Sequence, residues 1–410
     1  MSRVSKEYWP PEWDVKTLDE ICTLQIGRTP RRSNQDYWAN GTNTWATIAD
    51  MDSRSISSSK EQVSDKAIED NKVVLVPKGS LLMSFKLTIG KLAFAEEDLF
   101  TNEAIVALNI KSKFQEEIEP DYLYWVLQAV PLEKESIFAV KGRTLNTEKL
   151  KRIEMPIPER DVQRRIVARI EALLAEVREM QGLHDEITAD TARLMTLVIE
   201  ERFKELPPSR LSVGRLLAEP LRNGWSPPSN EHSGQTMVLK LGAVLGFEFN
   251  PTAIKYTNES TDENAQYWAK SGDIFITRSN TIDLVGHAAV YAGDPPNCIY
   301  PDLMIRIRFQ EELVDPRFTI YWLRSKEIRD YVTQNAKGAS PTMKKINQQH
   351  IRQMPFPDVD IVTQQHYVAY FSQIENEISA MEQVQAEDAR LIARINQGVL
   401  ARVFVENCNS

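Results

Sequence analysis

The sequence has few of the residues that build metal sites and disulfide frameworks. Its 410 residues include three cysteines and five histidines. Cys22, Cys298 and Cys408 are far apart and lack the spacing of a metal site. The histidines are equally scattered. This usage favours a protein of the reducing cytoplasm.

Long apolar runs are also missing. No run approaches the roughly 18 residues that span a membrane, and Met1–Val4 does not begin an apolar signal region. Hydrophobic residues make up 42% and charged residues 26%, as in soluble globular proteins. The length suggests two or three domains. These features predict a cytoplasmic protein with no membrane partner.

A surplus of positive charge is absent as well, since the formal net charge is −9. Non-specific binding to nucleic acid depends on neutralising phosphates with Lys and Arg. The acidic balance therefore argues against unaided, non-specific binding. It leaves room for specific binding through local basic loops, with partners supplying further phosphate contacts.

The sequence does not contain the usual signatures of phosphate or cofactor binding. No P-loop motif is present, and no Gly-rich S-adenosylmethionine loop follows an expected strand. Asp294–Asn297 resembles an amino-methyltransferase motif but lacks its aromatic residue, and a turn between two strands explains it better. Pro301-Asp302 precedes a strand as in some metal-dependent nucleases, but residues 305–308 supply neither the Glu nor the Lys of that site. We predict no catalytic, cofactor-binding or metal-binding residues.

What the chain does contain is a repeat of about 200 residues. Residues 141–144, 155–158 and 163–168 recur as residues 337–340, 354–357 and 364–369. Gly27–Pro30 matches Gly224–Pro227, and residues 78–82 match 271–275. Each half is long enough to form its own core. The repeat predicts a pseudo-two-fold symmetric molecule that meets its target at two related places.

The composition and the pattern of apolar residues change part-way through each half. Gly- and Pro-containing segments with short apolar runs come first; in the first half, residues 73–76, 81–85 and 104–108 are expected strands and 122–130 a short helix. The second half repeats this, with strands expected at 238–241, 274–277, 287–291 and 303–309 and a helix from 318 to 323. The fold class is therefore α+β, with two mixed α/β domains at 1–158 and 207–357 and two long helices at 159–206 and 358–410.

Both long helices have a heptad pattern, with eight apolar residues at ten seam positions in each copy. The apolar seam residues are Ile166, Ile170, Leu173, Val177, Met180, Ile187, Leu194, Val198, Tyr367, Phe371, Ile374, Ile378, Met381, Ile392, Ile395 and Val399. The simplest structure is an antiparallel coiled coil, a stiff rod holding the two domains apart. The alternative is that each helix packs on its own domain. The seam is broken by His184, Thr191, Gln385 and Asp388, which we expect to fix the register.

Several of these segments together resemble the specificity subunit of type I restriction–modification systems. They are residues 141–150 with Ile153 and Pro156–Pro158, then Gln163–Val167 and a long helix, and earlier Gly27, Thr29-Pro30, Tyr37-Trp38 and Trp45. The resemblance extends over nearly the whole chain, in the order recognition domain, helix, recognition domain, helix. The second copy departs in detail, with residues 339–341 in place of Arg143-Thr144 and Gln365-His366 in place of Arg164-Arg165.

The resemblance implies a non-catalytic DNA reader. Each recognition domain would read part of a bipartite, asymmetric double-stranded DNA site, and the paired helices would set the spacing. Two methyltransferase (modification) subunits and the restriction/translocase subunits would be the partners. S-adenosylmethionine, ATP and Mg would belong to those partners, in a phage-defence system.

The expected DNA contacts lie in three loops that recur in both halves. Arg, Asn and Lys suit base edges, while Ser, Thr and Lys suit phosphates. In the first half they are Arg28, Thr29, Arg31, Arg32, Lys86, Thr88, Lys91, Lys141, Arg143, Thr144 and Asn146. In the second they are Arg222, Asn223, Ser226, Arg278, Ser279, Asn280, Thr281, Lys337, Ser340, Thr342, Lys344 and Lys345. For any single residue the alternative is a solvated loop side chain.

Two other functions stay open on the sequence alone. One is a stand-alone bipartite DNA-binding regulator, against which the net acidity argues. The other is an enzyme with an unrecognised methyltransferase or nuclease site. Neither the target sequence nor its spacer length follows from these patterns.

Overall fold

The computed structural model describes residues 9–130, 132, 137–139, 142–207, 210–338 and 343–406, with backbone alone at 137–139 and 142–144. These residues form two compact units. The first contains the described residues up to 184 together with those from 387, and the second contains residues 185–386. Each unit combines sheets with helices, as expected for an α+β protein. The four domain boundaries expected from the sequence stay a prediction.

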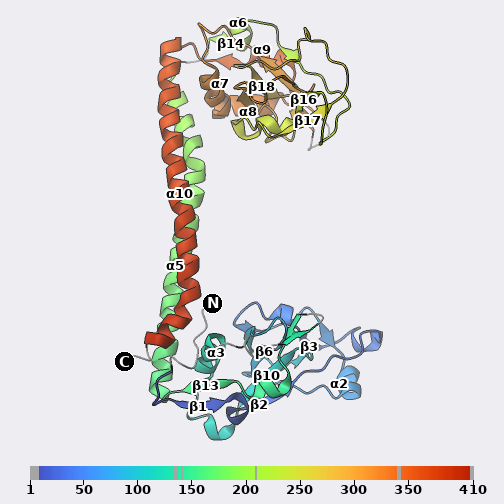
Figure 1. Cartoon of the computed structure of the whole chain (residues 1–410), viewed down its shortest axis with the longest axis vertical. Coiled ribbons are helices and arrows are strands. Elements are labelled where there is room, and N and C mark those ends of the chain that lie inside the picture. The colour runs from blue at the N-terminus through green and yellow to red at the C-terminus, as the bar shows by residue number, and fades with distance from the viewer. Residues whose placement is uncertain are drawn as a thin grey trace. The chain divides into compact units, whose positions relative to one another are not determined.

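The first unit is built around a five-stranded sheet in the order β2-β10-β6-β8-β4. All its pairings are antiparallel except that of β4 with β8. Its strands are β2 (Cys22–Ile26), β10 (Ile105–Ile110), β6 (Leu81–Ser84), β8 (Leu92–Ala95) and β4 (Ser55–Ile56). Every residue of β6 is buried, because this central strand packs on both faces. Helix α3 (Pro120–Ala129) lies between this sheet and the long helices (Figure 1).

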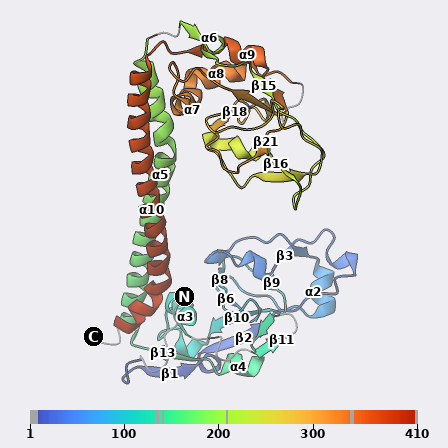
Figure 2. The ribbon, with the colours of Figure 1, turned by 45° about the horizontal axis from the view of Figure 1, so that its top comes forward.

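Smaller elements complete the first unit. The other sheets are β1 (Asp14–Thr17) with β13 (Glu154–Ile157), β5 (Gln62–Val63) with β3 (Asn43–Ala46) and β9 (Phe100–Thr101), and β11 (Ile137–Ala139) with β12 (Gly142–Thr144) and β7 (Lys86–Leu87). The short helices are α1 (Leu18–Ile21), α2 (Asp65–Asn71) and α4 (Thr147–Lys151). Figure 2 shows β11 beside α4 at the edge of the unit.

One strand expected in this unit is absent. Residues 73–76 form a single bridge, between Val76 and Leu99, rather than a strand. Val74 and Leu75 are exposed, so the apolar run does not mark a buried strand here. The other expected strands and the helix form, within a few residues of their expected bounds.

The second unit has a four-stranded sheet in the order β15-β22-β18-β20. Its strands are β15 (Arg222–Asn223), β22 (Met304–Ile307), β18 (Ile274–Thr277) and β20 (Ala288–Val290). Thr277 pairs with Met304 here, as Ser84 pairs with Ile105 in the first unit. Since these positions correspond in the sequence repeat, the central pairing has the same register in both units.

The remaining elements of the second unit are also short. Its other sheets are β17 (Ile254–Thr257) with β16 (Thr236–Leu239) and β21 (Cys298–Ile299), β14 (Leu211–Ser212) with β24 (Pro355–Phe356), and β19 (Ser279–Asn280) with β23 (Lys344–Lys345). Its helices are α6 (Val213–Leu216), α7 (Pro316–Arg324), α8 (Lys326–Asn335) and α9 (Gln348–Gln353). Asp294–Asn297 connects β20 to β21, which confirms the expected turn between strands.

The two long helices are α5 (Arg160–Lys204) and α10 (Ile361–Glu406). In the first unit, Ile166 and Ile170 share a core with Val399 and Val403, so the start of α5 packs with the end of α10. In the second unit, the ring of Phe203 near the end of α5 stacks on Phe371 near the start of α10, 5.8 Å between centroids. The helices therefore pack antiparallel within each unit, and both also contribute to the domain cores.

The expected seam is only partly buried. Buried positions are Ile166, Ile170, Val177, Phe371, Ile392 and Val399, and half-buried ones are Leu173, Leu194, Val198, Tyr367, Ile374 and Ile378. Met180, Ile187, Met381 and Ile395 are exposed, against the expectation. In the second unit the buried positions of α5 are Thr191, Met195 and Ile199, at steps of four. A strict heptad therefore does not continue along the helix.

Candidate nucleic-acid interface

In the first unit the three expected contact loops meet around the turn that links β9 to β10, at residues 101–104. Arg28 N donates to Thr101 O at 2.9 Å, and Phe85 N donates to Ala104 O at 3.0 Å. The loop after Phe85 in turn pairs with the third loop, because β7 and β12 are antiparallel neighbours. Segments more than 50 residues apart in the sequence are thus held together by backbone hydrogen bonds.

The second unit repeats this arrangement. Trp225 N donates to Tyr300 O at 2.9 Å, and Arg278 N donates to Leu303 O at 2.9 Å. Strands β19 and β23 pair antiparallel, as β7 and β12 do. The three loops that the sequence singled out therefore meet in both units at positions related by the repeat.

A glycine makes the close approach possible in each case. A Cβ on Gly27 would lie 2.2 Å from Thr101 O, and one on Gly224 would lie 2.0 Å from Tyr300 O. Such distances are far inside van der Waals contact. Any larger residue would push the first loop away from this turn, to which the second loop is hydrogen-bonded.

The first loop of the first unit is largely engaged within the protein. The Arg32 guanidinium lies over the rings of Trp38 and Trp45, 3.9 and 4.6 Å from their centroids, and pairs with Glu61. A second member, Arg28, donates from Nη1 to Asn71 O at 3.4 Å. These contacts hold the loop in place.

The rest of this loop differs in how far it is engaged. Thr29 Oγ1 donates to the Glu103 carboxylate. Arg31 is exposed and lines a cavity of about 490 Å³ together with Ser33 and Asn34. Among these expected contacts, Arg31 is the cation best placed to meet a ligand.

The corresponding hydroxyl of the second unit has the same kind of partner. Ser226 Oγ donates to the Asp302 carboxylate. Asn223 Nδ2 donates to Asp302 O at 3.2 Å, and Gln348 Nε2 donates to Asn223 Oδ1 at 2.8 Å. A hydroxyl–carboxylate pair beside the turn is thus common to both units, while Arg222 is exposed at the end of the loop.

The second and third loops contain both engaged and exposed side chains. Lys91 pairs with Asp52, and Lys344 Nζ donates to Gly338 O at 2.8 Å. Arg278 Nε is buried and has no hydrogen-bond partner among the described residues. The remaining members differ in exposure: Thr88, Lys337 and Lys345 are exposed, Lys86, Asn280 and Thr281 half-buried, and Ser279 buried.

Asn146 has a local structural role. Its side chain accepts a hydrogen bond from Lys149 N at 2.8 Å and caps α4. Asn347 caps α9 in the same way at the corresponding position, accepting from His350 N at 2.9 Å. The caps position the helix that follows the third loop in both units.

Some expected contacts fall outside the described residues. They are Lys141, Ser340 and Thr342. For Arg143 and Thr144 the backbone in β12 is described and the side chains are not. For every residue of the three loops, contact with DNA stays a prediction.

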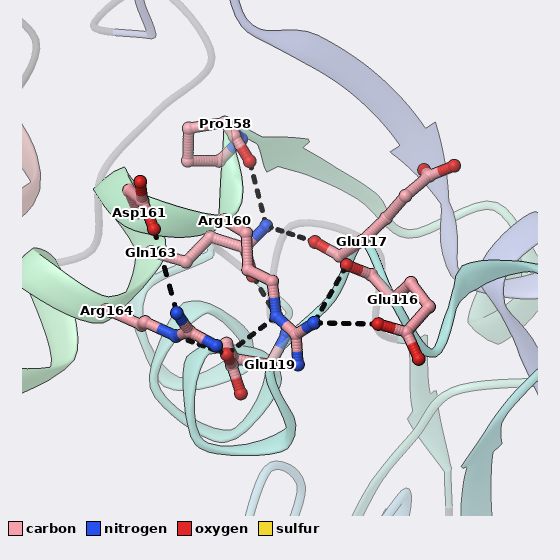
Figure 3. A network of polar contacts seen from close by, with 8 residues as sticks. All are labelled: Glu116, Glu117, Glu119, Pro158, Arg160, Asp161, Gln163 and Arg164. Atoms are coloured by element: carbon pink, nitrogen blue, oxygen red, sulfur yellow. Dashed lines mark hydrogen bonds and ion pairs between the residues drawn. The ribbon is translucent and has the colours of Figure 1, made fainter.

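We call the mixed α/β part of each unit its head. Each head is joined to the long helix that follows it by a buried glutamine. In the first unit (Figure 3), Gln163 Oε1 accepts from Glu119 N at 3.0 Å, and Nε2 donates to Glu117 O and Pro158 O, both at 2.8 Å. In the second, Gln364 Oε1 accepts from Asp315 N at 2.9 Å. These glutamines lie in the first turn of the long helices and fix the loops before α3 and α7.

Ion pairs strengthen the first of these junctions. Glu119 Oε1 accepts from Arg160 Nε and Arg164 Nε, both at 2.7 Å (Figure 3). The hydrogen bond from Arg160, together with that from Arg164, holds the pKa of the Glu119 carboxyl below its ordinary value. Arg54 adds a link from the head, because its guanidinium bridges Asp121 on α3 and Glu171 on α5 at 2.6 and 2.7 Å.

Comparison with known proteins agrees with this architecture. A family model described as type I restriction modification DNA specificity domain matches residues 10–189. The specificity subunit of the type I restriction enzyme MjaIX of Methanocaldococcus jannaschii is 28% identical over 38% of this chain and 37% of its own length. That of EcoKI of Escherichia coli K12 is 24% identical over 62% of this chain and 57% of its own length. The matches thus span between about a third and somewhat over half of these relatives.

Solved structures match over a larger part of the chain. The crystal structure of the HsdS subunit from Thermoanaerobacter tengcongensis is 20% identical, with a TM-score of 0.62, and the match covers 97% of this chain and 98% of that one. A chain from a structure on complex assembly of a type I R-M system gives a TM-score of 0.64 at the same identity and coverage. Residues 10–189 thus match the specificity-domain family, and the chain as a whole shares the fold of these two solved structures.

Three further findings bear on the candidate site of this chain. In the described ranges no three His, Cys, Asp or Glu side chains are grouped as a metal site would require, and no helix has the length and apolar composition that crossing a bilayer takes. Leu87 stands among the polar residues of the second loop and is exposed. A search of the sequence for polar and basic residues misses Leu87, because such a search considers only the amino-acid types that usually contact DNA.

Proposed function

We propose that this chain is the non-catalytic DNA-reading subunit of a type I restriction–modification complex. Each unit carries one reading head, and the two heads read the two parts of a bipartite, asymmetric site. The observation that supports this most is the convergence of three loops around a turn in both units, with the same backbone hydrogen bonds.

The heads differ where readers of different sequences should differ. At corresponding positions the first loop carries Arg28 in one head and Trp225 in the other, and the second carries Phe85 and Arg278. Backbone pairings are retained while side chains change. That combination suits a scaffold that presents varied base-reading groups on a constant framework.

Chemistry belongs, in this proposal, to partner subunits. Two copies of an adenine methyltransferase and the translocating nuclease subunits bind to this chain, and they hold S-adenosylmethionine, ATP and Mg²⁺. The long helices carry exposed apolar side chains that a docked partner would bury, which supports a docking role. They include Met180, Leu183 and Leu391 in the first unit and Ile187, Met381 and Val384 in the second.

The test separates an adaptor from an enzyme. The purified chain is incubated with DNA and radiolabelled S-adenosylmethionine, alone and with a co-expressed methyltransferase partner. We expect methyl transfer in the second case and none in the first, and no DNA cleavage by the chain alone. Methylation by the chain alone, abolished by Asp294→Ala, would show that the Asp294–Asn297 segment is catalytic and would refute the proposal.

A stand-alone regulator gives a different result in the same samples. It would bind one bipartite sequence tightly without any partner and would leave DNA methylation in cells unchanged when its gene is deleted. The adaptor proposal predicts that the deletion removes one methylated motif.

A further inference from the structure

Leu87 combines two unfavourable features at the end of β7. Its backbone lies in the left-handed region, with φ of 67°, which L side chains other than Asn and Asp seldom adopt. Leu87 is 56% exposed, so burial of its apolar side chain contributes little to the free energy of folding. A conformation of this kind persists only where surrounding structure enforces it.

The turn around Leu87 supplies that enforcement. Ser84 Oγ donates to Thr88 O and accepts from Lys91 N at 3.0 Å, and Gly90 N donates to Ser84 O at 2.8 Å. The flanks are tied as well, because Leu145 N donates to Phe85 O at 2.9 Å. Leu87 is therefore presented to solvent on a braced turn.

Its position corresponds to a base-reading candidate in the other head. Leu87 pairs with Arg143 between β7 and β12, and Asn280 pairs with Lys344 between β19 and β23. The two positions also match in the sequence repeat, counted from Gly79 and Gly272. Asn is the residue that reads an adenine edge by two hydrogen bonds, whereas an apolar side chain reads the methyl group of thymine.

We propose that Leu87 reads a T·A pair in the half-site of the first head, by contact of its side chain with the 5-methyl group of thymine in the major groove. This inference rests on the function proposed above. Leu87 lies on a strand of the β11-β12-β7 sheet, and paired strands are an element that the major groove admits. The half-buried Lys86 and exposed Thr88 on either side can meet phosphates.

The experiment removes the methyl group from the DNA and the side chain from the protein. Methylome sequencing of cells carrying the full chain and its partners first defines the site. Binding of the complete complex is then measured on duplexes of that site in which single thymines of the first half-site are replaced by deoxyuridine. The variants are Leu87→Ala, Leu87→Asn and, as a control, Leu75→Ala, which removes another exposed apolar side chain of the same unit.

At one thymine, we expect deoxyuridine to weaken binding by the parent complex about fourfold, the effect of losing one buried methyl group. Leu75→Ala should respond as the parent does. Leu87→Ala and Leu87→Asn should bind thymine and deoxyuridine duplexes equally. Because Asn tolerates the left-handed region, Leu87→Asn should also raise the melting temperature of the chain, so a loss of discrimination there does not come from misfolding.

Three results would overturn the proposal. The first is a first half-site without a T·A pair, and the second is equal binding of thymine and deoxyuridine duplexes by the parent at every position. The third is undiminished discrimination by Leu87→Ala. The fluorescence of 2-aminopurine, placed beside the thymine, rises when the base is unstacked. A rise that depends on Leu87 but not on the methyl group would show that the side chain wedges between bases, and would also overturn the proposal. Absence of any methylated motif that depends on this chain would refute the proposed function itself.

Discussion

Gln385 and Thr191 meet in the seam between the two long helices, where Gln385 Nε2 donates a hydrogen bond of 2.7 Å to Thr191 Oγ1. Thr191 Oγ1 in turn donates to Ile187 O at 2.8 Å. Thr191 is 4% exposed. Two of the residues that interrupt the apolar pattern are therefore partners, and a polar pair of this kind in a helix seam favours one helix register over its neighbours.

Removing one partner should deprive the other of its side-chain hydrogen bond across the seam. We expect Thr191→Val or Gln385→Leu to lower the free energy of unfolding by about 1–2 kcal/mol. The double variant should lose less than the sum of the two, because both polar groups are then gone. Urea denaturation of the four proteins measures this, and strictly additive losses would mean that the two side chains do not interact.

Gln364 offers a second test, at the junction of α10 with its head. Its side chain makes three hydrogen bonds to backbone groups, at Asp315, Leu313 and Val359. Gln364→Leu keeps the volume but leaves these groups unsatisfied, so we expect a loss of about 2 kcal/mol or more. Gln365→Leu, at an exposed position on the same helical turn, is the matched control and should change stability by less than about 0.5 kcal/mol.

The pH dependence of stability should depend on His287. Burial, with the positive charge of Arg329, lowers the pKa of this imidazole to about 4, and its Nδ1 accepts from Gly246 N at 3.0 Å. The unfolded chain takes up the proton near pH 6.5 and the folded chain near pH 4. Stability contributed by the neutral ring is therefore complete above about pH 6.5 and is lost as the pH falls toward 4.

A variant isolates that contribution. Denaturation of the parent and of His287→Asn at several pH values between 7 and 4 should show a smaller fall for the variant. If both proteins lose stability in parallel over this range, groups other than His287 control the acid response.

Local and periodic features of the sequence predicted much of the fold. The repeat, together with the change within each half from Gly- and Pro-containing segments to a heptad pattern, predicted two α/β regions and two long helices, and the observed bounds of α5 are Arg160–Lys204. The prediction of a strand at residues 73–76 was wrong, because a run of β-branched and apolar residues also suits an extended, partly exposed segment. Burial along the helices was less predictable, since it depends on which face each domain covers.

The candidate interface was predictable in its loops but not in the state of each side chain. Repeat-related polar loops indicated which segments lie together, and β7 with β12 and β19 with β23 are indeed paired. The pairing of Arg32 with Glu61, or of Lys91 with Asp52, depends on residues 29 and 39 positions away. Leu87 was missed because its significance lies in a backbone angle and an exposed fraction, which amino-acid type does not reveal.

The central claim is that each head reads its own half-site, and methylome sequencing of a loop variant tests it most directly. The variant is Arg278→Ala with Asn280→Ala, compared in cells with the parent chain and with Arg31→Ala in the first head. Loss of one bidentate base contact costs about 1–3 kcal/mol of discrimination. We predict that the methylated motif of the Arg278/Asn280 variant becomes degenerate in one half-site and keeps the other unchanged. Arg31→Ala should affect the opposite half-site, and degeneracy in both half-sites of either variant would contradict the account.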